Sequence, residues 1–213
     1  MLWSWQKPCD GVVRMTSFLQ TFYYWGVTAL AAAVSFIFYP CVVVGREHIP
    51  AKGGFILASN HESNIDPVLL PVACPRQMRF MAKEELFRHP LLAFLIRTGG
   101  GFPVRRGKVD RSALKEFLYQ LKQGYPVLIF PQGTRGGVKV QAGAGFLALN
   151  SAMPVIPAYI EGTDKVLAKG AVLPRRTLVK VVFGRPFVLP DGLSSQEASQ
   201  QIMARISELK PSL

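Results

Sequence analysis

The sequence predicts an α/β fold, with a single mixed sheet flanked by helices and an apolar helical membrane anchor at the N-terminal end. Short apolar runs of strand length alternate with segments of helical spacing, and this alternation predicts the α/β class. A long uncharged segment ahead of them predicts the anchor. We therefore expect a membrane-associated helical segment over residues 1–41 and an α/β domain over residues 42–213.

The composition favours a membrane contact and an anionic partner. Of the 213 residues 49% are hydrophobic and only 18% are charged, which is apolar for a water-soluble domain. The net charge is +12, and such an excess attracts phospholipid, a phosphorylated substrate or nucleic acid. The three cysteines are scattered without metal-ligand spacing or a disulfide framework, so we expect no metal site and a reducing compartment.

The N-terminal segment contains no charged residue between Met15 and Gly45. Its most apolar part, residues 18–39, reaches the length of about 20 residues that a spanning helix needs. It could cross the bilayer once, or it could enter one leaflet as an in-plane helix or a hairpin broken near Gly26. Because basic residues flank both ends, the positive-inside rule does not choose an orientation.

Strands and helices then alternate along the rest of the chain. The expected strands cover residues 41–45, 55–59, 78–82, 127–130, 155–160 and 178–183. The expected helices cover residues 91–96, 112–123, 145–151 and 194–210. The clearest helix is 112–123, whose large apolar side chains fall on one face and which ends at Gly124. The glycine-rich residues 99–107 are expected to form a loop.

A polar octet, Asn60 to Pro67, follows an expected strand and therefore lies at the edge of the sheet where α/β sites usually lie. It carries His61 and, five residues later, Asp66. An Asp that accepts the Nδ1–H of a His fixes the tautomer whose Nε2 can take a proton from a hydroxyl. No serine or cysteine nucleophile motif accompanies the pair, so that hydroxyl can belong to a substrate. The alternative is structural, because Asp66-Pro67 also fits a plain helix start and His61 a loop histidine.

Three further loops share one chemical character. One begins at Lys83, one runs from Gly100 to Arg106, and one runs from Gly133 to Arg135. Glycine lets backbone N–H groups approach an anion, and arginine or lysine adds positive charge. Each loop suits a phosphate, although glycine and basic residues also occur together in ordinary turns.

With these loops, the chain resembles the glycerophosphate acyltransferase superfamily and, within it, the bacterial 1-acyl-sn-glycerol-3-phosphate acyltransferases. The first motif of that family, Asn-His followed by four residues and Asp, is met by Asn60 to Asp66, and the second by Gly100 to Arg106. The third, Phe-Pro-Glu-Gly-Thr-Arg, is met by Phe130 to Arg135, and the fourth by Val155 to Pro157. The resemblance covers roughly residues 42–190.

Two positions depart from the pattern of that family. Pro103 stands where the second motif usually has Phe, and Gln132 replaces the glutamate of the third motif. Glutamine has a similar length and can form hydrogen bonds, but it carries no charge. If the glutamate mainly orients its neighbours, Gln132 can serve in its place, whereas activity falls or the acceptor changes if its charge matters. We expect an active enzyme.

The resemblance implies an enzyme that moves a fatty acyl group from a thioester to the free hydroxyl of 1-acyl-sn-glycerol-3-phosphate (lysophosphatidic acid), giving phosphatidic acid. It implies that His61 is the catalytic base and that Asp66 orients it. The residues expected to bind the substrate are Lys83, Arg106, Gln132, Gly133, Thr134 and Arg135. It implies no cofactor beyond the co-substrate, either acyl-CoA or acyl-carrier protein. It also implies contact with membrane phospholipid on the cytoplasmic face of the inner (plasma) membrane.

Other functions remain open at this point. The same chemistry could act on another lysophospholipid or on a lyso-amino-acid lipid, because the third motif is altered at Gln132. A non-catalytic lipid-binding membrane protein could retain the fold, although the intact His61 and Asp66 argue against it. Nucleic-acid binding would use the charge of +12, but the chain lacks a helix-turn-helix, a zinc pattern and aromatic-interleaved basic strands. We therefore expect no nucleic-acid partner.

Overall fold

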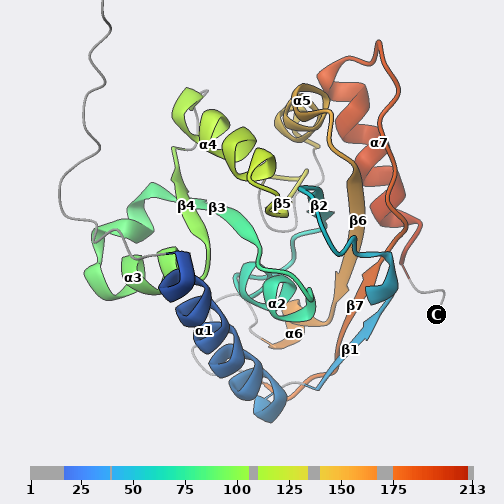
Figure 1. Cartoon of the computed structure of the whole chain (residues 1–213). Helices are drawn as coiled ribbons and strands as arrows, with labels where there is room; N and C mark the ends of the chain where they lie inside the picture. Colours follow the sequence, from blue (N-terminus) through green and yellow to red (C-terminus); the bar gives the residue numbers. More distant parts are fainter. Residues whose placement is uncertain (1–16, 39, 106–109, 134–139, 167–174, 211–213) are drawn as a thin grey trace, which may run out of the picture.

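A computed structural model describes residues 17–38, 40–105, 110–133, 140–166 and 175–210 of the chain. In these segments seven strands form one sheet, in the order β1-β7-β6-β2-β5-β3-β4 (Figure 1). The strands are β1 Cys41–Val44, β2 Ile56–Ser59, β3 Arg79–Lys83, β4 Gly101–Val104, β5 Val127–Ile129, β6 Val155–Glu161 and β7 Val179–Phe183. Strands β6-β2-β5-β3-β4 run parallel, whereas β7 is antiparallel to β6. The predicted α/β fold with a single mixed sheet is confirmed.

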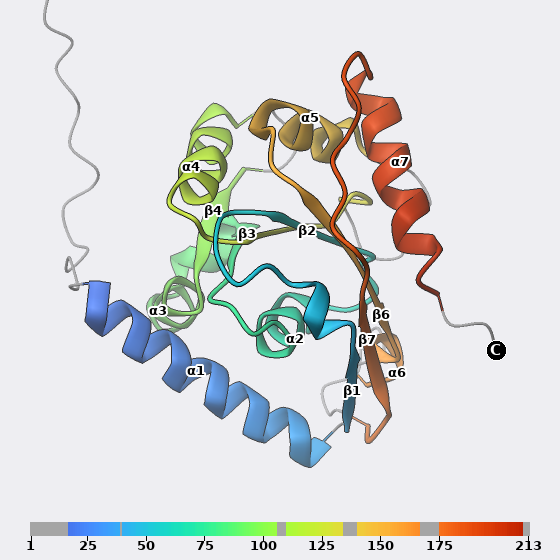
Figure 2. The same ribbon diagram turned by 45° about the vertical axis from the view of Figure 1, so that its right-hand side comes forward.

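Helices cover both faces of the sheet. The α-helices are α1 Ser17–Phe38, α2 Asp66–Ala73, α3 Pro90–Thr98, α4 Arg111–Lys122, α5 Ala142–Ser151, α6 Thr163–Val166 and α7 Ser195–Ser207. The short 3-10 segments are η1 Arg46–His48 and η2 Glu84–Arg88. Helices α4, α5 and α7 form one layer, and α1, α2 and α3 lie on the opposite side (Figures 1 and 2). Within the second layer, α1 packs on α2 and α3.

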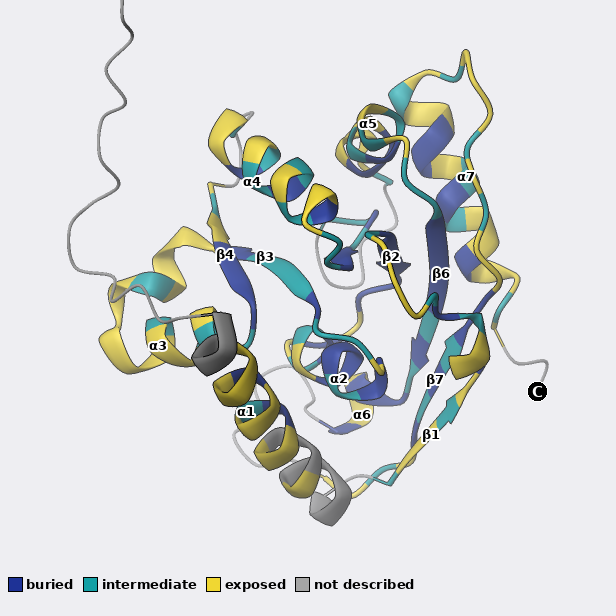
Figure 3. Cartoon of the chain, viewed as in Figure 1, coloured by how far each residue is buried: buried dark blue, intermediate teal, exposed yellow. Residues whose placement is uncertain are grey.

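Alternation along the central strands decides which side chain meets which layer. In β2, Ile56 and Ala58 pack with residues of α4, α5 and α7, while Leu57 packs on the other side with Leu69 and Leu70 of α2. A strand that is buried on both faces needs a continuous apolar sequence, which β2 has. The core therefore lies on both sides of β2, β5 and β6, which Figure 3 shows as buried.

Two local features stabilise the layer of α4, α5 and α7. They are the N-cap of α4 and a close backbone contact between α5 and α7. Asp110 caps α4, because its side chain accepts the backbone N–H of Ser112 at 3.0 Å. The Ser112 hydroxyl, followed by the backbone N–H of Arg105, lowers the pKa of Asp110 to about 2. Helices α5 and α7 touch at Gly145, where a Cβ would collide with the carbonyl oxygen of Ser195.

Helix α1 is docked on the sheet by Tyr24. The Tyr24 side chain is completely buried, and its hydroxyl oxygen accepts the backbone N–H of Met78 at 3.0 Å. Burial raises the pKa of Tyr24 to about 12. Among the residues that the structure describes, no helix is both long enough and apolar enough to cross a membrane. A spanning helix, one of the two expected topologies, is therefore not found.

The expectation that residues 99–107 form a single glycine-rich loop is wrong. Part of this segment is the edge strand β4, where Pro103 is tolerated because an edge strand has one unpaired side. Gly100 has a φ of 90°, and a Cβ there would collide with the carbonyl oxygen of Met78. Gly100 and Gly101 let the turn after α3 approach β3 closely, at the opposite end of β4 from Arg105. They do not form one phosphate-binding loop with that arginine.

Candidate active site

The parallel strands end at one edge of the sheet, and the candidate site follows those ends. The octet follows β2, the turn with Gln132 follows β5, and Lys83 is the last residue of β3. The order β2-β5-β3 places the octet beside the Gln132 turn, with Lys83 one strand further along. The topology therefore gathers residues from three separate parts of the chain.

Asn60 fixes the start of the octet to the neighbouring strand β6. Its Nδ2 donates to the carbonyl oxygen of Ile160 at 2.8 Å, and its Oδ1 accepts the backbone N–H of the same residue at 2.8 Å. The Asn60 side chain thus extends the parallel pairing one step beyond Ser59, which pairs with Ala158. Because Asn60 is buried, these bonds hold the octet to the sheet without competition from water.

His61 and Asp66 form a buried pair at the centre of the octet. The distance from His61 Nδ1 to Asp66 Oδ2 is 2.8 Å, and the two residues are 7% and 0% exposed. The same carboxylate oxygen accepts the backbone N–H groups of Glu62 and Ser63, each at 2.8 Å. An ionised carboxylate only accepts, so His61 donates from Nδ1 and its Nε2 is the basic nitrogen. This is the arrangement that a general base requires.

Asp66 does not act as the cap of α2. It is the first residue of the helix, and Ile65 takes the N-cap position without a side-chain capping bond. Pro67 follows in the first turn, where its missing N–H needs no partner. The Asp66 carboxylate is turned back toward the octet instead. A plain helix start therefore does not describe this residue.

The turn after β5 makes two contacts with His61. The Phe130 ring stacks on the imidazole, with 4.1 Å between ring centroids and an interplanar angle of 19°. Gln132 Oε1 accepts the backbone N–H of His61 at 2.9 Å. The Phe-Pro-Gln-Gly sequence forms this turn, because Pro131 presets its first corner and the N–H of Gly133 closes it on the Phe130 carbonyl at 2.9 Å.

The expected phosphate-binding residues divide into two groups. Lys83 is exposed at the same edge of the sheet as His61, and Gly133 has a positive φ of 67° in the turn beside it. Arg105, next to the expected Arg106, is paired with Glu84, the residue after Lys83, since its Nε lies 3.0 Å from Glu84 Oε2. The expected residues Arg106, Thr134 and Arg135 lie outside the described residues.

The charges around the site are uneven. Burial raises the pKa of Tyr159 in β6, and the carboxylates of Glu161 and Glu62 raise it further. The side of the octet that faces β6 therefore carries Glu62 and Glu161, whereas β3 and η2 bring Lys83 and Arg88 together with Glu84 and Glu85. Across the described segments, no three His, Cys, Asp or Glu side chains are grouped to hold a metal ion.

Sequence reasoning missed three contacts of the octet. They are the bonds of Asn60 to Ile160, the Phe130 stack, and the bond from the His61 backbone to Gln132. Two of them join residues 100 and 71 positions apart, which no local pattern shows. The available signal was membership of Asn60, Phe130 and Gln132 in two motifs.

Comparison with known proteins gives the class of protein to which this sheet and site belong. A family model described as Acyltransferase matches residues 40–161, which include the octet, the turn after β5 and strand β6. The chain therefore belongs to the acyltransferase family.

Relatives within that family carry one name. The chain is 32% identical over 180 residues to the 1-acyl-sn-glycerol-3-phosphate acyltransferase of Bacillus subtilis, which covers 80% of this chain and 88% of that protein. It is 34% identical over 139 residues to the protein of the same name from Streptococcus pneumoniae, covering 64% and 51%. The crystal structure of the 1-acyl-sn-glycerophosphate (LPA) acyltransferase PlsC from Thermotoga maritima matches with a TM-score of 0.74 and 27% identity, covering 95% of this chain and 86% of that one. The predicted resemblance is confirmed.

Proposed function

We infer that this protein is a 1-acylglycerol-3-phosphate O-acyltransferase, which moves a fatty acyl group onto the free hydroxyl of lysophosphatidic acid and gives phosphatidic acid. The observation that carries this conclusion is the buried pair of His61 and Asp66, 2.8 Å apart, which leaves Nε2 of the imidazole basic. Family membership supplies the reaction class, and the names of the relatives supply the acceptor.

His61 acts as the general base of this reaction. Its Nε2 takes the proton of the acceptor hydroxyl as that oxygen attacks the thioester carbonyl carbon. The new C–O bond forms, the C–S bond breaks, and the leaving thiolate takes the proton back from the imidazolium. Asp66 stabilises the imidazolium through Oδ2, and the stacked face of Phe130 also favours the cation. No acyl-enzyme is needed, because the substrate supplies the nucleophile.

The acceptor phosphate binds on the Lys83 side of the octet. Glu62 and Glu161 repel an anion from the β6 side, and Lys83 attracts it from the β3 side, where Arg105 pairs with the neighbouring Glu84. By resemblance, Arg135 with the backbone of Gly133 and Thr134 is the first set of phosphate ligands. Lys83 and Arg106 are the second.

The acyl donor is a thioester on an anionic carrier, and no other cofactor takes part. Acyl-CoA carries phosphates, and acyl-carrier protein is acidic, so the net charge of +12 favours an encounter with either. Separate turnover measurements with each donor would identify the carrier.

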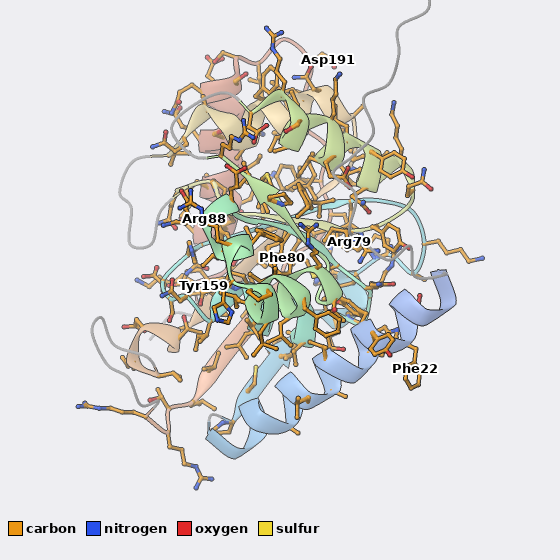
Figure 4. The ribbon with its side chains drawn as sticks, turned by 90° about the vertical axis from the view of Figure 1, so that its left-hand side faces the viewer. Phe22, Arg79, Phe80, Arg88, Tyr159 and Asp191 are labelled. Atoms are coloured by element: carbon orange, nitrogen blue, oxygen red, sulfur yellow. The ribbon has the colours of Figure 1, made fainter. Side chains whose placement is uncertain are left out.

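The enzyme works at the surface of a phospholipid membrane, on the cytoplasmic face of the inner (plasma) membrane. Helices α1 and α3 contact each other, and both carry large apolar residues that are exposed. Figure 3 colours parts of both helices as exposed. These apolar side chains, which we call the α1–α3 surface, are Phe22, Tyr23, Trp25 and Leu30 of α1 and Leu91, Leu92, Phe94 and Leu95 of α3. Figure 4 shows Phe22 projecting from α1. Exposed Arg88 and Arg97 of η2 and α3 would attract anionic lipid toward this surface. Helix α1 then serves as an anchor in one leaflet.

Turnover of the wild type and of His61→Ala tests the reaction. In detergent, with long-chain acyl-CoA or acyl-carrier protein and 1-acyl-sn-glycerol-3-phosphate, we expect kcat to fall roughly two to four orders of magnitude in the variant, the usual contribution of a general base. His48→Ala is the matched control, because His48 Nδ1 bonds the Phe183 carbonyl at 2.9 Å, away from the octet. Near-normal turnover by His61→Ala would refute the mechanism. Turnover by wild type only with acceptors that lack a terminal phosphate would move the assignment to another lyso-lipid.

A further inference from the structure

Gln132 contacts the backbone of His61, the proposed general base, rather than the imidazole ring of His61. The Gln132 Oε1 accepts the backbone N–H of His61 at 2.9 Å. His61 is only 7% exposed, so water has little access to replace this acceptor. The ring is oriented from within the octet by Asp66, whereas the Gln132 bond comes from a different strand end.

The turn that carries Gln132 is braced. Its closing bond runs from the N–H of Gly133 to the Phe130 carbonyl at 2.9 Å. The N–H of Gln141, just before α5, donates to the Pro131 carbonyl at 2.8 Å. A fixed φ at Pro131 and a positive φ of 67° at Gly133 leave the turn few other conformations. The backbone that carries the Gln132 side chain is therefore held in one conformation.

The bond from His61 requires an acceptor but not a negative charge. A backbone N–H only donates, so the amide oxygen of Gln132 faces it. That oxygen cannot also bind the acceptor phosphate, because a phosphate accepts hydrogen bonds. A glutamate would present a carboxylate oxygen to the same N–H. Gln132 thus keeps the acceptor that the third motif supplies and omits only its charge.

We propose that Gln132 is a positioning residue for His61. The octet follows β2, whose two neighbours in the sheet are β6 and β5. Asn60 bonds the octet to β6, and Gln132 bonds it to the turn after β5, so the backbone of His61 is clamped from both sides. The clamp sets the direction in which Nε2 meets the acceptor hydroxyl. This role rests on the proposed acyl transfer and is separate from the substrate-binding role that the sequence predicted for Gln132, because the bond to His61 uses only Oε1.

Two substitutions in the full chain separate the effect of the hydrogen-bond acceptor at position 132 from the effect of a negative charge there. Gln132→Met has a similar length and no strong acceptor, whereas Gln132→Glu keeps one. In Gln132→Met we expect kcat to fall roughly ten- to hundredfold while KM for lysophosphatidic acid stays within about twofold, because the base is misdirected and phosphate binding is intact. In Gln132→Glu we expect kcat within about threefold of the wild type. Gln141→Met is the control, since the Gln141 side chain makes no capping bond at its position before α5.

Amide hydrogen exchange at His61, measured by NMR, gives a second readout that needs no turnover. Loss of the acceptor should raise the exchange rate of this N–H at least about tenfold in Gln132→Met, with little change in Gln132→Glu or Gln141→Met. A raised KM with unchanged kcat in Gln132→Met would overturn the proposal, as would wild-type kcat together with wild-type exchange. An inactive wild type would refute the proposed function alone. The exchange rates would then decide whether Gln132 holds His61.

Discussion

The two helical layers of the molecule differ in what they present to the outside. Helix α4 buries Phe117 and Leu121 against the sheet, and α7 buries Ile202 and Ile206. On the opposite side α3 buries no residue, and it exposes Leu91 by 63% and Phe94 by 50%. An outward apolar stripe adds nothing to the core, so this difference fits our proposal that the α1–α3 surface contacts membrane lipid.

The largest expected effect concerns the α1–α3 surface. The double substitution Leu91→Glu and Phe94→Glu should lower the affinity for vesicles with anionic lipid at least about hundredfold, because each side chain contributes roughly 1.5–3 kcal/mol when it is buried in an apolar phase. Vesicle flotation measures this. The thermal midpoint should stay unchanged, since both side chains are exposed.

Tyr119→Glu provides the control on the other layer. Tyr119 is also an exposed aromatic residue, but it lies on α4. Its vesicle affinity should match that of the wild type apart from a small loss of net charge. Tyr119→Glu adds one negative charge and the double variant adds two. An equal loss per added charge would mean that charge, rather than the α1–α3 surface, controls binding, and the contrast between the layers would disappear.

The next effect concerns the close contact of α5 and α7. Gly145→Ala should lower the free energy of unfolding by about 2 kcal/mol, because its Cβ would collide with the Ser195 carbonyl and two rigid helix backbones would have to separate. Chemical denaturation measures the change. Gly143→Ala is the matched control, since nothing lies within 4 Å of its Cβ position in the same helix. It should stabilise the protein by roughly 0.5–1 kcal/mol, the usual gain for glycine to alanine in a helix.

The smallest effect concerns the cap of α4. Asp110→Ala should cost about 1 kcal/mol at neutral pH, the typical value of a lost N-cap. The folded-state pKa of Asp110 is lowered from 3.8 to about 2, so the ionised cap stabilises the fold fully above pH 4. This contribution is lost as the pH falls toward 2. The stability difference between wild type and variant should therefore shrink over that window.

Asp191→Ala is the comparison for the cap. Asp191 is an exposed residue in the loop before α7 (Figure 4), so its removal should leave stability nearly unchanged at every pH. If the Asp110 variant showed no pH-dependent difference from this control, the capping bonds would be energetically irrelevant.

Most of the fold could be predicted from the sequence because its central strands are continuous apolar runs. Strands β2, β5 and β6 are buried on both faces, and that requirement is visible in each sequence. Strand β4 was not predicted, because Gly101 and Pro103 are poor strand formers whose conformation is imposed by pairing with β3. The exposed face of α1 could not be foreseen, since apolar residues alone do not show which of them are buried.

The candidate site was partly visible in the sequence because some of its contacts are local. His61 and Asp66 meet within one turn, so their spacing indicated the pair. Ile160 and Gln132 bond to Asn60 and His61 from the two neighbouring strands. These contacts depend on the strand order, which local patterns do not contain.

The bonds of Asn60 to Ile160 have a consequence for synthesis of the chain on the ribosome. The octet is complete only when residues separated by 100 positions in the chain have met, and β6 lies late in the sequence. Closing so long a loop is entropically costly and precedes any gain from the contact. A nascent chain that ends before β6 contains His61 and Asp66 but lacks the strand that fixes them. The proposed catalytic pair is therefore held in place only late in translation, long after α1 has been synthesised.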